Sequence, residues 1–175
     1  MSVFPAEPFD GIEQITVEPT PIAVVRHVGL RLSDLARVFD PAYTALARAF
    51  AEGALVPAGP AGPALAVYHG DAMAEFDLEI GFPVEAAPSA PLTVDGIEIS
   101  ASALPGGSAL ATTHIGGFEG LGAAWAGLYG EAASRGLERS GDWIEIYVSD
   151  PRTTAETDLR TDLVLGIEAP ASPDV

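Results

Sequence analysis

Two matching stretches decide the fold of this chain: ALAVYHGD at residues 64–71 and WIEIYVSD at residues 143–150. Each follows an apolar segment with helical spacing, and that segment in turn follows a strand-like stretch ending in His, at 22–27 and at 109–114. A second strand-like segment comes after each stretch. The sequence therefore predicts two copies of one strand–helix–strand–strand module.

The two copies align His27 with His114 and Tyr68 with Tyr147. The His-to-Tyr separation is 41 residues in the first copy and 33 in the second. The loop at 56–63 is rich in Pro and Gly, which form turns without extending a strand or helix, so it absorbs the difference.

This alignment sets the expected organisation, which is α+β with pseudo-twofold symmetry. We expect a single domain over 1–175, with repeat one at about 15–84, a linker at about 85–95, repeat two at about 96–167 and a mobile tail at 168–175.

Helix boundaries are indicated by capping residues. In the first copy, Asp40-Pro41 is typical of a helix start and Gly53 of a helix end. The alternatives are a short turn before this helix, or one longer helix kinked at Pro41. In the second copy, an apolar stripe containing Trp125 and Leu128 predicts a helix, although its glycines lower its intrinsic stability.

Composition excludes several classes of function. The 8 basic residues, all Arg, stand against 25 acidic ones, for a formal net charge of −17. Such a surface disfavours direct nucleic-acid binding; it either serves solubility alone or attracts cations. The absence of Cys excludes disulfides, thiolate metal sites and cysteine nucleophiles. No apolar run approaches the roughly 20 residues of a membrane span, and no secretory signal is recognisable, so we expect a cytoplasmic protein.

The strand at 143–148 carries the candidate binding residues. Ile144, Ile146 and Val148 share one face, which we expect to pack on the helices. Trp143, Glu145 and Tyr147 share the other face. Two aromatic rings around one carboxylate suit a hydrophobic cation, which binds π faces and needs a counter-charge. The alternative is that Glu145 lies on an ordinary exposed strand face.

Tyr68 and Tyr147 are related by the repeat, so we expect them to face each other across a groove. If Glu145 is buried, its pKa rises and it can act as a general acid or base, with either tyrosine orienting water. The alternative for both tyrosines is packing at the groove edge.

The three histidines favour no metal site. His27 and His114 end equivalent strands, which indicates a shared structural role in the turn to the helix. The alternatives are ligand or proton-transfer duty, or haem ligation, for which no flanking motif exists. His69 adjoins Gly70-Asp71 and is predicted to lie in a loop. The sequence predicts no cofactor.

Over about residues 15–167 the chain resembles the GyrI-like small-molecule-binding domains, which are also the effector-binding domains of bacterial transcription activators. The resemblance rests on an ordered set of features: HVG at 27–29, HIGGFEG at 114–120, a helix with Trp125 and Leu128 followed by RGL, WIEIYVSDP at 143–151, and TDLVLGI at 161–167.

The resemblance implies curved antiparallel sheets with the helices on one side and a groove along the pseudo-symmetry axis. It implies a binding protein for hydrophobic, cationic small molecules, with Glu145, Trp143, Tyr147 and Tyr68 as ligand contacts. The alternatives are a hydrolase of cyclopropane-containing or other strained natural products, using Glu145 and a Tyr, and a module that inhibits DNA gyrase. A separately encoded DNA-binding regulator, gyrase and a second copy of the chain are the candidate protein partners.

Overall fold

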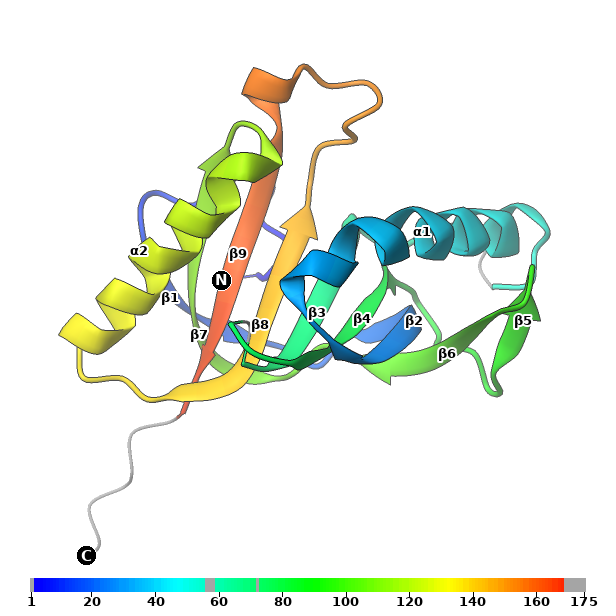
Figure 1. The fold of residues 1–175 in the computed structure, drawn as a ribbon, viewed down its shortest axis with the longest axis horizontal. Coiled ribbons are helices and arrows are strands. Elements are labelled where there is room, and N and C mark those ends of the chain that lie inside the picture. The colour runs from blue at the N-terminus through cyan, green and yellow to red at the C-terminus, as the bar shows by residue number, and fades with distance from the viewer. Residues whose placement is uncertain (1, 56–58, 72, 169–175) are drawn as a thin grey trace, which may run out of the picture.

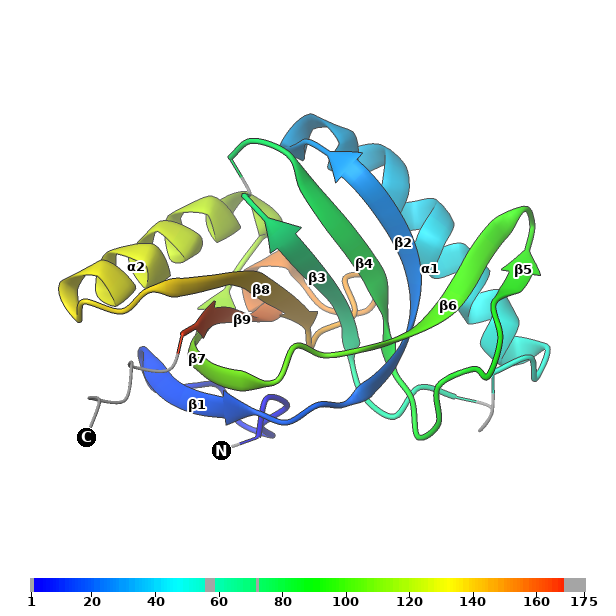
Figure 2. The same cartoon turned by 90° about the horizontal axis from the view of Figure 1, so that it is seen from below.

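The protein has an α+β fold, in which helices α1 and α2 cover the same face of a curved antiparallel sheet (Figure 1). The computed structural model describes residues 2–55, 59–71 and 73–168. Within these residues the sheet has nine strands in the order β1-β7-β9-β8-β3-β4-β2-β6-β5. Figure 2 shows its curvature. No helix in the described part is long and apolar enough to cross a membrane.

The strands are β1 (Glu13–Val17), β2 (Pro21–Leu30), β3 (Ala64–Gly70), β4 (Phe76–Pro83), β5 (Leu92–Val94), β6 (Ile97–Ala103), β7 (Gly107–Ile115), β8 (Arg139–Tyr147) and β9 (Arg160–Ile167). The helices are α1 (Leu35–Ala51) and α2 (Leu121–Ser134), each preceded by a 3₁₀ turn, at Leu32–Asp34 and Phe118–Gly120; a third 3₁₀ turn spans Glu156–Asp158.

The predicted repeat is present as β2–α1–β3–β4 and β7–α2–β8–β9. The two modules meet where β3 pairs with β8, with Ala66 opposite Glu145 and Tyr68 opposite Trp143. Ala66 and Glu145 are also equivalent in the sequence repeat, so the pseudo-twofold axis passes through this pair. Glu145 therefore lies at the centre of the sheet, opposite the small side chain of Ala66.

The halves also exchange strands. β1, which precedes the first module, pairs with β7 of the second, while β6 pairs with β2 of the first. Residues 92–94, which the sequence assigned to the linker, form strand β5 against β6. The expected mobile tail falls almost entirely on residues 169–175, outside the described residues.

Two apolar cores lie on opposite faces of the sheet. Trp143 belongs to the core beneath the helices, whereas Ile144 and Ile146 belong to the core on the other face. The prediction that the aliphatic face of this strand packs on the helices is therefore wrong. The far face is also buried, by β1, the β6–β7 connection and the N-terminal segment, so alternation alone did not identify the helix side.

Helix α1 runs through Pro41 as one longer helix, which was the alternative left open, so the start at Asp40 is wrong. The apolar face of the helix packs on the sheet. The stabilisation from this packing outweighs the cost of the backbone hydrogen bond that Pro41 cannot donate. The predicted end is confirmed, because Gly53 follows the helix with φ +71° and Ala54 N–H donates to Ala49 O.

A buried arginine holds the N-terminal segment on the face away from the helices. The Arg160 guanidinium donates to the carbonyls of Pro5, Ala6 and Glu7 and forms a 2.7 Å ion pair with the fully buried Asp162. This segment contributes Val3 and Phe9 to the second core.

Candidate functional site

Glu145 lies on β8 and faces the two helices, with 7% of its surface exposed. The reading of this residue as an ordinary exposed strand residue is therefore wrong. Its neighbours across the sheet are Ala66 on β3 and Leu163 on β9, neither of which carries a polar side chain. A carboxyl group at this position must find its partners among the side chains above the sheet.

Three neutral donors converge on the Glu145 carboxyl group. Trp125 of α2 donates its indole N–H to Oε1 at 2.9 Å. The hydroxyl oxygens of Tyr68 and Tyr147 are both within hydrogen-bond distance of Oε2, at 3.3 Å and 2.5 Å. The repeat-related tyrosines thus meet at one oxygen atom, close to the pseudo-twofold axis. Among the described residues, Glu145 has no arginine or histidine partner.

Aromatic rings surround this cluster. Tyr68 and Trp143 stack with their centroids 4.0 Å apart, and Trp125 meets Trp143 edge-on at 5.0 Å. Tyr147 lies edge-on between Phe39 of α1 and Phe118 of the 3₁₀ turn before α2, at 6.1 Å and 5.9 Å. We call Tyr68, Trp125, Trp143 and Tyr147, together with Glu145, the aromatic cage.

Burial decides the electrostatics of the cage. It raises the pKa of Glu145, and the hydrogen bonds from Tyr147, Trp125 and Tyr68 only partly oppose that rise. Burial also raises the pKa values of Tyr68 and Tyr147 far above the ordinary value of a tyrosine, and the negative charge of Glu145 adds to this. Both tyrosines are therefore neutral hydrogen-bonding groups at physiological pH.

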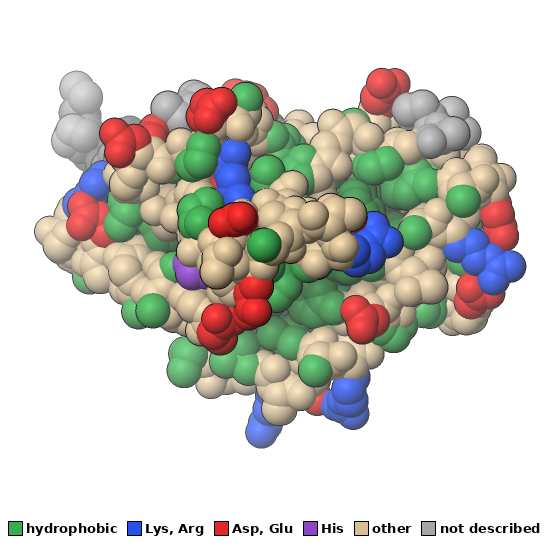
Figure 3. All heavy atoms as spheres, turned by 90° about the horizontal axis from the view of Figure 1, so that it is seen from above, with side chains coloured by type: hydrophobic (Ala, Val, Ile, Leu, Met, Phe, Trp, Pro, Cys, Tyr) green, Lys and Arg blue, Asp and Glu red, His purple; other side chains and the backbone are tan. Residues whose placement is uncertain are grey.

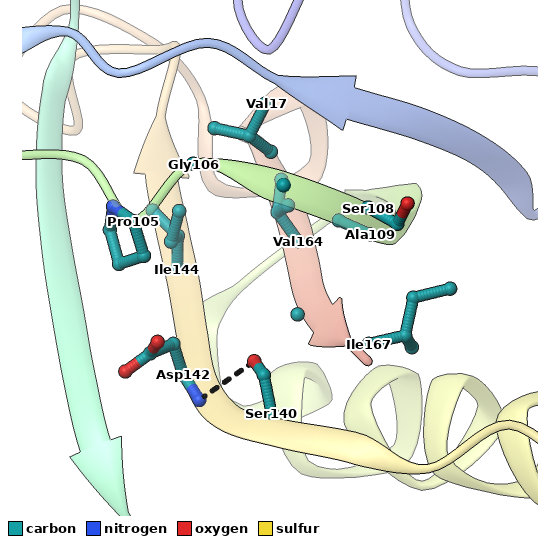
Figure 4. A pocket seen from close by; sticks show the side chains of 12 residues that line it. Val17, Pro105, Gly106, Ser108, Ala109, Ser140, Asp142, Ile144, Val164 and Ile167 are labelled. Atoms are coloured by element: carbon teal, nitrogen blue, oxygen red, sulfur yellow. Dashed lines mark hydrogen bonds between the residues drawn. The ribbon is translucent and has the colours of Figure 1, made fainter. Parts of the chain in front are cut away.

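The cage is closed in this structure, because Glu145, Trp125, Trp143 and Tyr68 are all buried. Glu145 lines neither of two cavities, of about 70 Å³ and about 400 Å³. The smaller lies on the face away from the helices, between β1, β7, β8, β9 and the connection from β6 to β7 (Figure 4). Tyr147 is the half-buried member of the cage, at the end of β8. A ligand can reach Glu145 only if a covering side chain moves, and Tyr147 is the most exposed of these.

The surface near Tyr147 is apolar. Phe118 and Val148 are among its exposed hydrophobic residues. Figure 3 shows hydrophobic side chains on both sides of the projecting β8–β9 loop, with acidic side chains and some arginines around them. Such a rim suits a ligand that is both hydrophobic and positively charged.

All four predicted site residues, Glu145, Trp143, Tyr147 and Tyr68, lie together in the cage. Sequence reasoning missed Trp125, which it had assigned only to the apolar stripe of a helix. One available indication was that Trp125, one of only two tryptophans in the chain, lies on the predicted helix of the same repeat as Glu145.

The histidines have separate environments. His114 Nε2 lies 2.9 Å from Gly117 O in the turn that leads into α2, consistent with the structural role expected. His27 Nε2 is buried without a hydrogen-bond partner among the described residues, and burial lowers its pKa. The two histidines are thus not equivalent in bonding.

The sequence predicted a loop at His69, but this residue lies in β3. Its side chain is on the face of the sheet opposite the cage. Its Nδ1 lies 2.6 Å from Asp142 and its Nε2 lies 3.0 Å from Glu79, which also accepts from Arg26. Hydrogen bonding to Glu79 raises the pKa of His69 to about 8, against the opposing effect of burial. Burial alone would raise the pKa of Glu79, but the bonds from His69 and Arg26 lower it to about 2.

The sequence match fits this arrangement. A model of the GyrI-like small molecule binding domain matches residues 11–168. The chain belongs to this family. No curated protein matches the chain.

Solved structures share the GyrI-like fold at low sequence identity. The EcmrR C-terminal domain has a TM-score of 0.68 at 13% identity, over 90% of this chain and 96% of that one. SAV2435 bound to tetraphenylphosphonium has a TM-score of 0.59 at 7% identity, over 90% and 93%. A hydrolase from Listeria innocua has a TM-score of 0.61 at 18% identity, over 93% and 94%. At these identities the likeness establishes the fold alone.

Proposed function

We propose that this protein binds hydrophobic organic cations, with the cation over the aromatic cage and Glu145 as its counter-charge. The observation that carries the proposal is a buried carboxyl group with three neutral donors and no cationic side-chain partner among the described residues. Burying an acid in this way costs stability, and a group retained at such a cost is a candidate for function.

The ligand chemistry follows from the groups around the carboxyl. Trp125, Trp143, Tyr68 and Tyr147 offer ring faces and edges, which attract cations and pack against flat apolar groups. Three donors already occupy much of the hydrogen-bonding capacity of Glu145. A bulky cation without N–H groups therefore loses little affinity by forming no hydrogen bond to this carboxyl group. The membership of the GyrI-like family and the tetraphenylphosphonium bound by SAV2435 support this class of ligand.

A pair of matched ligands tests the proposal. Methyltriphenylphosphonium is the cation, and triphenylphosphine oxide is a neutral compound of similar shape. We expect the cation to raise the melting temperature of the wild type more than the neutral compound does, because it binds the native state. In Glu145→Gln, which keeps the side-chain shape, this preference should disappear.

A control variant separates the effect of Glu145 on cation binding from the effect of the net negative charge of the protein. Glu131→Gln removes an acid on the exposed side of α2 and should leave the preference for the cation intact. Equal stabilisation by the cation in wild type and Glu145→Gln would contradict the role of Glu145. A lack of stabilisation by either ligand would contradict the binding function.

A second candidate function is hydrolysis of a strained electrophile, with Glu145 as proton donor and Tyr147 or Tyr68 orienting water. The observation that favours it is the convergence of both tyrosine hydroxyls on Glu145 Oε2. A carboxyl group with a raised pKa is a suitable general acid near neutral pH. Product formation beyond one equivalent per protein, lost in Glu145→Gln, would support hydrolysis over binding alone.

A further inference from the structure

The bonding pattern of the cage bears on the protonation state of Glu145. Its nearest polar groups are two hydroxyls and an indole N–H, all neutral. The arginine ion pairs that the structure describes go to other acids, on the surface or on the opposite face of the sheet. An ionised carboxylate at this position has no nearby positive charge to offset its desolvation.

We infer that Glu145 is protonated in the ligand-free protein and that capture of a cation expels this proton to solvent. This inference rests on the proposed function and adds its regulation: binding is an exchange of one cation for one proton. The O–H bond of the carboxylic acid breaks, its electron pair stays on the carboxylate, and the proton passes to water or buffer.

The donor geometry assigns the proton to one oxygen. The Trp125 indole N–H can only donate, so Oε1 must accept from it in both protonation states. A tyrosine hydroxyl can donate or accept. Oε2 is therefore the atom that carries the proton, and the Tyr147 hydroxyl, 2.5 Å away, accepts from it. When the proton leaves, this hydroxyl turns and donates to the carboxylate.

None of the groups that face Glu145 changes its protonation state near neutral pH, so Glu145 is the member of the cage that titrates. Tyr68 comes from β3, Tyr147 from β8 itself, Tyr43 from α1, and Trp125 with Tyr129 from α2. Leu163 of β9 is its apolar neighbour in the sheet. Burial raises the pKa of each of the four tyrosines, so none ionises near neutral pH, and tryptophan does not titrate in this range. Burial raises the pKa of Glu145 above its ordinary value, which favours the protonated form.

Titration calorimetry with methyltriphenylphosphonium tests the inference. Binding enthalpies measured at one pH in buffers of different ionisation enthalpy give the number of protons released. We expect release to approach one proton per cation at the acidic end of the titration, where Glu145 is protonated before binding, and to fall at higher pH as the free protein loses this proton, while cation affinity rises. Triphenylphosphine oxide should release none. His69→Gln serves as a control, since His69 titrates in the same range on the other face.

Infrared spectroscopy of the wild type provides a measurement that needs no variant. The stretching band of a protonated buried carboxyl should be present without ligand and should be lost on adding the phosphonium. Cation binding with no proton release and no loss of this band would overturn the inference and leave the proposed function standing. Failure of the cation to bind would overturn both.

Discussion

Trp125 and Trp143 allow the role of one hydrogen bond to be measured by the same substitution at two places. Both indoles are buried beneath the helices, with 6% and 5% of their surfaces exposed. Trp125 donates to Glu145 Oε1 at 2.9 Å, whereas the Trp143 N–H has no partner among the described residues. Trp→Phe removes similar atoms from each, but only at Trp125 does it remove a hydrogen bond to the carboxyl group.

The expected effect follows from the change in charge on binding. A hydrogen bond contributes about 0.5–1.5 kcal/mol with a neutral acceptor and about 1.5–3 kcal/mol with a charged one. The bond from Trp125 therefore strengthens by about 1–1.5 kcal/mol when Glu145 ionises, so Trp125→Phe should weaken cation binding about 5- to 12-fold. Trp143→Phe should change it less than about 3-fold.

Calorimetric titration of both variants with methyltriphenylphosphonium gives the comparison, with triphenylphosphine oxide as the neutral ligand. Affinity for the neutral ligand should change by a similar small factor in the two variants, since both lose part of an aromatic surface. Equal losses of cation affinity in Trp125→Phe and Trp143→Phe would refute the reasoning, because the hydrogen bond to Glu145 would then have no special role.

Two further predictions concern stability. Arg160→Met should lower the free energy of unfolding by about 3–5 kcal/mol in urea titrations, because it leaves the buried Asp162 without its cationic partner. Arg152→Met, at an exposed pair, should change it far less, and equal losses would contradict this account. The pKa of His69 is raised from 6.5 to about 8, so its stabilising effect is complete below pH 6.5 and is lost as the pH rises through about 8. Because a third of His69 is exposed, we expect a loss of only about 1 kcal/mol, seen as a fall in melting temperature that His69→Gln abolishes; a persisting fall in that variant would assign it to another group.

The repeat and the cage strand could be predicted because they depend on local patterns. Alternation around Glu145 placed Trp143 and Tyr147 on its face, and the repeat brought Tyr68 to it. The sequence did not show which face meets the helices, because Ile144 and Ile146 are buried too, beneath strands that come from distant parts of the chain. That arrangement depends on tertiary contacts, which a local period of two does not encode.

The contacts made between distant elements were also missed, and for a related reason. Trp125 has the spacing of an ordinary core residue, and only the packing of α2 against the sheet brings its N–H to Glu145. His69 was assigned to a loop because Gly70-Asp71 follows it, yet β3 continues through Gly70 between two neighbouring strands. Pairing with those strands outweighed the turn residues.

A crystal structure with tetraphenylarsonium would test the central claim most directly, since anomalous scattering locates the arsenic atom without a model of the ligand. The account predicts one arsenic peak beside Glu145, within about 6 Å of the rings of Trp125 and Tyr147, with the Tyr147 side chain displaced. A peak elsewhere, such as in the cavity between Asp71 and Arg139, with the cage still closed, would contradict the claim that Glu145 holds the cation.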